Sequence, residues 1–343
     1  MSKRHPPVPR GLFPTGKLPP EHLKRQLERM AHADKRVIIG PRYGEDATVI
    51  DIGGRLFVCA CDPVTLASER IGRYAVHVNA NDIAVMGALP RWFWATVLLP
   101  EGKSDERLVE AIFRDMRETC RGIGVELCGG HTEITPGLAR PIVSGFMSGE
   151  AEKETLVDKK TIRPGDDIVM SRGIAIEGTA TIALDRPHVI APLGDDLIRR
   201  AGALLSDPGI CVIREAQLAV RTARVHGMHD PTEGGISTGL RELAEVAEVG
   251  LEINEGEIDI LPETQSICSH LRLDPMGLLA SGSLIIVTDP ASTGALLAAY
   301  RKNKIPASLI GKTRKREFGL RLRRAGTLFP LPEFERDELL RIP

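Results

Sequence analysis

Apolar residues recur at helical spacing between residues 75 and 87, but polar side chains interrupt the run. The apolar positions that share one helical face, and so predict a helix, are Val76, Ala80, Ile83 and Ala84. The polar residues inside the same stretch are His77, Asn79, Asn81 and Asp82. Asn and Asp are poor helix formers, and burying each without a partner costs about 1–3 kcal/mol. This pattern predicts a helix that faces a ligand, a metal or a polar network; the alternative is an exposed polar face or an N-cap at Asn79 or Asn81.

Alternating and continuous apolar patterns predict strands on both sides of this helix. In the first half, strands are expected at 36–40, 47–52, 55–61, 91–99, 125–134 and 141–150, and helices at 21–33 and 105–123 with Ser104 as the second helix's N-cap. In the second half, strands are expected at 167–171 and 278–289, helices at 195–205 and from 236, and a last helix and strand within 296–310. A polar, charged stretch between 151 and 167 predicts the domain boundary. We therefore expect an arm and helix at 1–34, domains at 35–155 and 160–325, and a tail at 326–343.

Composition restricts the classes of function. A chain of 343 residues with 42% hydrophobic and 27% charged residues is typical of two soluble domains. Its net charge of −1 and 4% aromatic content argue against nucleic-acid binding, and the ten Lys or Arg within 301–324 are read as a solvated basic face. No apolar run approaches the roughly 20 residues that span a bilayer. Six cysteines without a CxxC pair predict reduced core thiols and a cytoplasmic protein.

Three aspartates come from three separate predicted elements of the first half. Asp46 precedes a strand, Asp62 follows one, and Asp82 lies on the central helix. Mg²⁺ takes oxygen ligands and is usually held by a few carboxylates together with substrate phosphates. The three carboxylates therefore suggest a metal–nucleotide site, although Asp62 before Pro63 is also an ordinary turn signal.

Two glycine pairs accompany further polar residues. Gly129 and Gly130 interrupt a predicted strand and would bring bare backbone close to another group, with His131 and Glu133 projecting from one side. Downstream, the run His229-Asp230-Pro231-Thr232-Glu233-Gly234-Gly235 leads into a predicted helix. Backbone amides at a helix start form a ready anion site, whereas ordinary N-capping by Asp230 or Thr232 is the structural alternative.

Taken together, these motifs resemble the AIR synthase superfamily, nearest to its HypE branch. The resemblance rests on five stretches in order: Gly44-Glu45-Asp46-Ala47, Asp62-Pro63, Asn79-Ala80-Asn81-Asp82, Gly129-Gly130-His131-Thr132-Glu133 and His229-Asp230-Pro231-Thr232. It implies a two-domain α+β fold in which the N-terminal domain dimerises through a shared β-barrel. It also implies ATP and Mg²⁺ as cofactors, with ATP in the cleft between the domains, and phosphorylation of an amide or carbamoyl oxygen on an acceptor.

The resemblance also assigns roles to residues. Asp46, Asp62 and Asp82 would hold Mg²⁺. The nucleotide would be bound by Asn79, Asn81, Gly129, Gly130, Asp230, Gly234 and Gly235. The candidates for acceptor contact or proton transfer are His131, Glu133 and His229.

Three positions depart from the HypE pattern. The chain ends in Pro343 where HypE has a carrier cysteine, Ser281 replaces a turn glutamate, and Glu233 replaces an arginine. The leading expectation is therefore an ATP-dependent enzyme that acts on an unidentified acceptor. The alternatives are a hydrogenase maturation factor whose thiol another protein supplies, working with other maturation proteins, and a dimeric nucleotide-binding scaffold without turnover.

Overall fold

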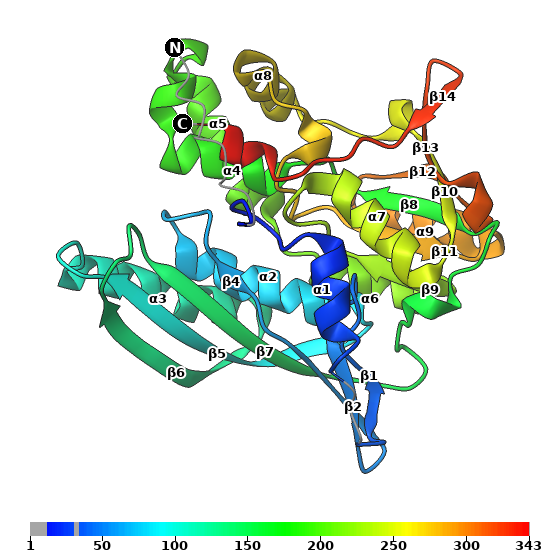
Figure 1. The fold of residues 1–343 in the computed structure, drawn as a ribbon, viewed down its shortest axis with the longest axis horizontal. Coiled ribbons are helices and arrows are strands. Elements are labelled where there is room, and N and C mark those ends of the chain that lie inside the picture. Colours follow the sequence, from blue (N-terminus) through cyan, green and yellow to red (C-terminus); the bar gives the residue numbers. More distant parts are fainter. Residues whose placement is uncertain (1–11, 31–33, 343) are drawn as a thin grey trace. The chain divides into compact units, whose positions relative to one another are not determined.

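The computed structural model describes residues 12–30 and 34–342, which divide into two compact units (Figure 1). The N-terminal unit comprises residues 34–40 and 46–156. The C-terminal unit comprises residues 157–342 together with 12–30 and 41–45. The fold is α+β, with one mixed sheet in each unit.

The N-terminal unit is built on a sheet of strand order β1-β2-β3-β7-β5-β6, with β4 also pairing with β7. Its strands are β1 (Val37–Ile39), β2 (Thr48–Ile52), β3 (Arg55–Ala60), β4 (Pro63–Val64), β5 (Leu89–Pro100), β6 (Glu126–Thr135) and β7 (Ile142–Ala151). Helix α2 (Ile71–Val85) packs on β3, β5 and β7, and α3 (Glu106–Ile123) packs beside it (Figure 1). The side chains of β5 alternate accordingly: Phe93 and Val97 are buried beneath the helices, whereas Trp94 points to the other face, where it contacts Phe146 of β7.

The expected helix around residues 75–87 is confirmed as α2, whereas the expected N-cap of α3, Ser104, is wrong. The polar residues of α2 are buried, with Asn79 and Asn81 fully inaccessible, so the helix does not present a polar face to solvent. Helix α3 is capped by Asp105, which accepts from the amide of Leu108 at 2.9 Å, and Ser104 is not the N-cap. The Ser104 hydroxyl instead donates to the carbonyl oxygen of Pro100, because it lies one residue too early to reach the free amides of the first turn.

The C-terminal unit has a sheet of order β14-β13-β10-β12-β8-β11-β9. Its strands are β8 (Asp167–Ser171), β9 (Val225–His229), β10 (Gly250–Asn254), β11 (Leu284–Thr288), β12 (Ala307–Arg314), β13 (Leu320–Arg324) and β14 (Thr327–Pro330). Its helices are α1 (Pro20–Leu27), α4 (Ile176–Asp185), α5 (Asp195–Ala203), α6 (Ile213–Thr222), α7 (Gly235–Ala247), α8 (Pro262–Leu271) and α9 (Pro290–Lys302). The core joins the buried face of α7, including Ile236, Leu240 and Leu243, to buried residues of β8 and β10.

Several boundaries differ from those expected. The first helix ends at Leu27, and the last residues assigned to it, 31–33, lie outside the described residues. The expected strand at 278–289 is shorter because Leu278 to Ser283 form a turn and a bridge before β11 begins. The glycine-containing stretch from Gly173 contains the start of α4, which the sequence did not predict.

The six cysteines are all free thiols, and they do not all lie in the core. No disulfide joins the six cysteines, but only Cys120 and Cys268 are buried, so the expectation that all are core residues is wrong.

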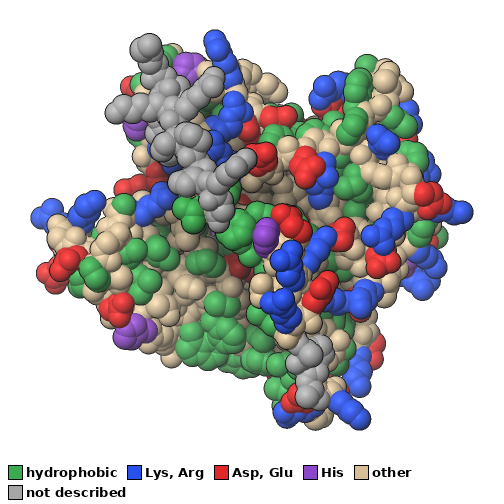
Figure 2. All heavy atoms as spheres, viewed as in Figure 1, with side chains coloured by type: hydrophobic (Ala, Val, Ile, Leu, Met, Phe, Trp, Pro, Cys, Tyr) green, Lys and Arg blue, Asp and Glu red, His purple; other side chains and the backbone are tan. Residues whose placement is uncertain are grey.

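The basic residues of 301–324 are interleaved with acidic partners, as the intermixed colours over β10, β12 and β13 show (Figure 2). These pairs are Glu252 with Arg314 and Arg323, Glu255 with Arg324, and Asp167 with Lys312. None of the helices within 12–30 and 34–342 is long and apolar enough to cross a bilayer.

Candidate functional site

The three aspartates of the predicted metal site all lie in the N-terminal unit. Thr48 of β2 pairs with Cys59 of β3 in an antiparallel register. Asp46 comes two residues before this pair and Asp62 three residues after it, so both carboxylates lie at the same end of the sheet. Sheet geometry therefore brings together two residues that are separated by a hairpin in the sequence.

Asn79 attaches this end of the sheet to helix α2. Its Oδ1 accepts from the amide of Asp62 at 2.9 Å, and its Nδ2 donates to the Asp62 carbonyl oxygen at 3.1 Å and to that of Ala75 at 2.8 Å. The Asp62 carbonyl also accepts from the amide of Gly145 at 2.9 Å. A Cβ at Gly145 would lie 2.3 Å from Asn79 Nδ2, so the close fit requires glycine. Asn79 thus fixes the backbone that carries the Asp62 carboxylate.

Asp82 follows Asn79 by three residues and therefore lies on the same face of α2, one turn further along. It is 5% exposed, whereas Asp46 is partly exposed and Asp62 is exposed. Carboxylate oxygens are hard ligands of the kind that Mg²⁺ prefers. The chemistry of these donors suits a magnesium ion, but the structure does not bring the ligand atoms of all three aspartates within 4.8 Å of one another.

The glycine pair lies in register with this region. Gly130 of β6 pairs with Ala95 of β5, which in turn pairs with Gly145 of β7. These three residues form one row across the sheet, and the row leads to Asp62 through Gly145. A Cβ at Gly130 would lie 1.8 Å from the carbonyl oxygen of Ala95, so no larger residue fits without moving the strands.

His131 and Glu133 do not join the three aspartates. His131 pairs with Thr96 of β5, one position beyond the row of Gly130, so its side chain points to the sheet face opposite α2. Its Nε2 lies 3.2 Å from Glu133 Oε2, and both side chains are exposed. Hydrogen bonds from Thr135 and then His131 lower the pKa of the Glu133 carboxyl. This exposed pair lies on an edge strand, on the face that carries Trp94 and Phe146.

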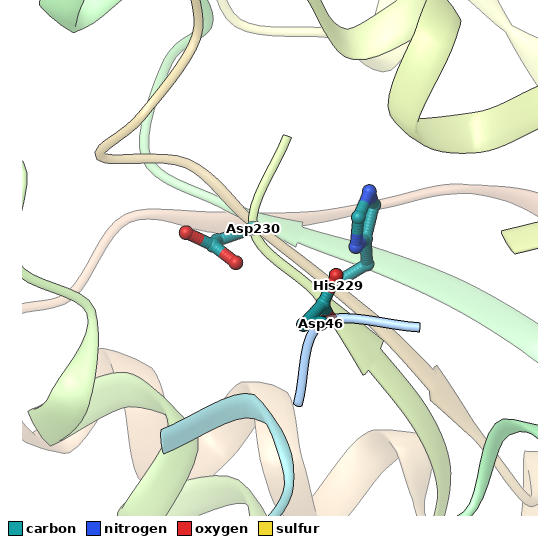
Figure 3. A group of neighbouring side chains, drawn as sticks. All are labelled: Asp46, His229 and Asp230. Carbon is teal, nitrogen blue, oxygen red and sulfur yellow. The ribbon is translucent and has the colours of Figure 1, made fainter. Parts of the chain in front are cut away.

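His229 and Asp230 belong to the C-terminal unit, at the end of β9. Figure 3 shows their side chains leaving the backbone in different directions, and it also labels Asp46 of the N-terminal unit. His229 is 4% exposed, with Nε2 3.2 Å from Glu242 Oε2 and Nδ1 3.4 Å from Lys159 Nζ. Both ring nitrogens of His229 therefore have a polar partner, and these two contacts fix the orientation of the imidazole.

Two lysines complete this network. Lys159 is 1% exposed and also donates to the carbonyl oxygen of Gly44 at 2.7 Å. Lys17 forms a 2.9 Å ion pair with Glu242. Burial disfavours the charged form of Glu242, but Lys17 and His229 outweigh it and lower its pKa to about 2. The sequence did not single out Lys159 or Glu242: Glu242 is one charged residue in an apolar helix, and Lys159 is one of several in the polar stretch 151–167.

The glycine pair at the start of α7 is not capped by Asp230 or Thr232. Gly234 is the N-cap residue, and its amide donates to Asp337 Oδ2 at 2.7 Å. A Cβ at Gly235 would lie 2.3 Å from the carbonyl oxygen of Met276, which explains the second glycine. The amide expected to bind an anion thus binds a carboxylate of the chain itself, contributed from 103 residues away.

A further buried carboxylate lies in the same unit. Glu177, in the first turn of α4, is 4% exposed. Burial raises its pKa to about 7, although hydrogen bonding by Ser281 acts in the opposite direction. The available sequence signal was a single acid in the apolar run from Ile174 to Ala180, the same kind of signal that identified the polar residues of α2.

Comparisons with known proteins agree with this architecture. Residues 44–151 match the model of the AIR synthase related protein N-terminal domain, and residues 163–322 match that of its C-terminal domain. The carbamoyl dehydratase HypE of Rhizobium leguminosarum bv. viciae is 30% identical over 279 residues, covering 79% of this chain and 77% of its own.

Two solved structures share the fold. The structure of a HypE–HypF complex matches with a TM-score of 0.73 and 20% identity, covering 91% of this chain and 99% of its own. That of hydrogenase maturation protein HypE in complex with ATP matches with a TM-score of 0.69 and 24% identity, covering 92% and 91%.

Proposed function

The chain belongs to the AIR synthase related family, and from this membership we propose that it is an ATP- and Mg²⁺-dependent enzyme that activates an amide or carbamoyl oxygen on an acceptor. The observation that carries the proposal is the position of Asp46 and Asp62 at one end of the N-terminal sheet, with the buried Asp82 on α2 one turn beyond Asn79, which binds the Asp62 backbone. A HypE of the same fold binds ATP, and a relative 30% identical to this chain is named a carbamoyl dehydratase.

In this proposal the three aspartates would hold Mg²⁺, which would neutralise charge on the nucleotide phosphates. The chain's own contribution is positioning. Asn79 fixes the backbone of Asp62 through two hydrogen bonds, and α2 presents Asp82 on the same face. Phosphoryl transfer needs little covalent work from a protein, which fits a site built from carboxylates, amides and glycines.

The acceptor need not be that of HypE. Glu233 and Ser281 stand where the HypE pattern has an arginine and a glutamate. Pro343, which lies outside the described residues, has no thiol to carry a carbamoyl group. The alternative of HypE-type maturation with a thiol from another protein is favoured only by the names of the relatives.

We also propose that the chain forms a homodimer through the outer face of the N-terminal sheet. This face carries Trp94 and Phe146, whose rings lie 5.4 Å apart, and Figure 2 shows hydrophobic side chains gathered where β5 and β7 lie. The adjoining edge strand β6 is exposed along its length, and Ile134 is 55% exposed. An apolar sheet face beside an open edge is suited to pairing with a second copy.

The test of the metal assignment is Asp82→Asn, which removes a ligand charge and preserves the side-chain volume. We expect Mg-ATP affinity, measured by titration calorimetry, to fall at least about tenfold while circular dichroism stays unchanged. Glu106→Gln, which removes an exposed charge from the first turn of α3, is the matched control and should leave affinity unchanged. Unchanged affinity in well-folded Asp82→Asn would contradict the assignment.

A separate measurement distinguishes enzyme from scaffold. Release of ADP from Mg-ATP, stimulated by amide or carbamoyl compounds, is expected of the enzyme. Tight ATP binding without ADP release, whichever acceptor compound is added, would favour the non-catalytic scaffold.

A further inference from the structure

Residues 41–45 belong to the C-terminal unit, although β1 and β2 of the N-terminal unit lie on either side of them in the sequence. We call this stretch the crossing segment. The chain leaves the N-terminal unit after Gly40 and returns to it at Asp46. Because Asp46 is bonded directly to the end of the crossing segment, contacts that fix this segment also restrict the backbone that carries the Asp46 carboxylate.

The crossing segment packs closely on α7. Gly44 has a φ of +79°, and a Cβ there would lie 2.7 Å from the carbonyl oxygen of Glu242 and 2.9 Å from Cγ2 of Val246. The amide of Glu45 donates to the carbonyl oxygen of Arg42 at 3.2 Å and closes a turn. A glycine is therefore required at the point where this turn touches the helix.

Lys159 holds the same turn from a different part of the C-terminal unit. Its Nζ donates to the carbonyl oxygen of Gly44 at 2.7 Å and lies 3.4 Å from His229 Nδ1. The other ring nitrogen of His229, Nε2, lies 3.2 Å from Glu242 Oε2. These contacts form a closed ring, because the backbone carbonyl of Glu242 is the group against which Gly44 packs.

This ring contains a buried ammonium group. Lys159 is 1% exposed, whereas the next residue, Lys160, is exposed. Lysine is almost never fully buried unless its charge is paired or hydrogen-bonded, because removing an ammonium group from water is costly. A methionine would fill the same space without that cost, so a buried lysine indicates a polar task. The hydrogen bond to the backbone two residues before Asp46 is such a task.

We propose that Lys159 is a positioning residue for Asp46: it holds the Gly44 carbonyl and thereby fixes the backbone that presents the Asp46 carboxylate as a magnesium ligand. His229 and Glu242 in turn orient the Lys159 side chain. The inference rests on the proposed Mg-ATP function and adds to it a residue far from the three aspartates in the sequence. In this role Lys159 acts through the crossing segment, without contact to metal or nucleotide.

The sign of the expected effect separates positioning from charge. Removing a positive charge from the protein by itself favours the binding of a divalent cation, because like charges repel. Loss of positioning weakens metal binding, since a carboxylate whose backbone is no longer held is less often in the geometry of a ligand. Weaker Mg²⁺ binding in a variant that lacks the Lys159 charge is therefore explained by lost positioning and not by lost charge.

The test is titration calorimetry of ATP binding to the full chain, once with Mg²⁺ and once with EDTA in its place. The ratio of the two affinities is the gain that Mg²⁺ provides. Wild type is compared with Lys159→Met and with Lys160→Met, which removes the neighbouring exposed lysine and is the matched control. We expect Lys159→Met to lower the gain about tenfold and to leave the metal-free ATP affinity unchanged, whereas Lys160→Met should match wild type in both measurements.

An unchanged gain in folded Lys159→Met, or an equal fall of both affinities, overturns the positioning role. Asp82→Asn separates this inference from the proposed function. A gain that is lost in Asp82→Asn but kept in Lys159→Met overturns the inference alone, whereas a wild type without any gain overturns both. Should Lys159→Met not fold, Gly44→Ala replaces it, because the added Cβ displaces the same turn from the side of α7. Retention of the full gain in folded Gly44→Ala overturns the proposal equally.

Discussion

Replacing Asn79 by alanine tests whether this buried amide holds the Asp62 backbone in place. The side chain makes two hydrogen bonds to Asp62 and one to Ala75, and it is fully inaccessible to solvent. In Asn79→Ala the Asp62 carbonyl keeps its bond from Gly145, but the Asp62 amide loses its bond to Asn79 Oδ1. The loss therefore concerns chiefly one partly buried donor, the Asp62 amide.

A buried donor deprived of its acceptor costs about 1–3 kcal/mol, and the lost contacts of the side chain add to this. We expect a total of about 2–3 kcal/mol, which corresponds to a melting temperature lower by about 5–10 °C. Asn79→Asp should be at least as destabilising. It keeps an acceptor for Asp62 but places a carboxylate oxygen against the carbonyl oxygens of Asp62 and Ala75.

The assay is thermal unfolding followed by circular dichroism, with Asn254→Ala as the control. Asn254 is an exposed cap whose side chain accepts from the amide of Gly256 at 3.3 Å, and its loss should cost less than about 1 kcal/mol. A melting temperature of Asn79→Ala within about 1 °C of wild type would refute the reasoning. Weaker Mg-ATP binding in Asn79→Ala, but not in Asn254→Ala, would further link the anchor to the proposed metal site.

Two further predictions concern strands β6 and β7 of the same sheet. Gly130→Ala would place a Cβ 1.8 Å from the Ala95 carbonyl oxygen, so we expect a loss of about 1–3 kcal/mol by urea unfolding. Gly122→Ala, in open space on α3, should be neutral or stabilising; equal behaviour of the two variants would contradict the steric argument. Phe146→Asp should give a monomer by sedimentation velocity, whereas Phe329→Asp on the exposed β14 should not; an intact Phe146→Asp dimer would place the interface elsewhere.

Two of the positions at which this chain departs from the HypE pattern, Glu233 and Ser281, lie near Glu177. The amide of Glu177 donates to the carbonyl oxygen of Ser281, and Glu233 interacts electrostatically with the Glu177 carboxylate. An acid therefore stands near Glu177 where the pattern would supply an arginine. This change in charge supports an acceptor different from that of HypE.

The sequence alone indicated most elements of the N-terminal unit and the metal candidates, whereas in the C-terminal unit it missed several elements, including α4. Local periodicity was sufficient for α2 and for β8, because the face that a residue occupies follows from its spacing along one element. The positions of Asp46 and Asp62 at one end of the sheet also followed from strand ends. Each of these features depends on neighbours within a few residues.

Only the tertiary structure decided which side chains meet. The resemblance made His131 and Glu133 candidates for acceptor contact or proton transfer, and strand register places this pair on the sheet face opposite α2. Asp337 docks on Gly234 across 103 residues, and no local pattern marks the two as partners. Pairing register and chain-end docking depend on long-range packing, which spacing within one element does not encode.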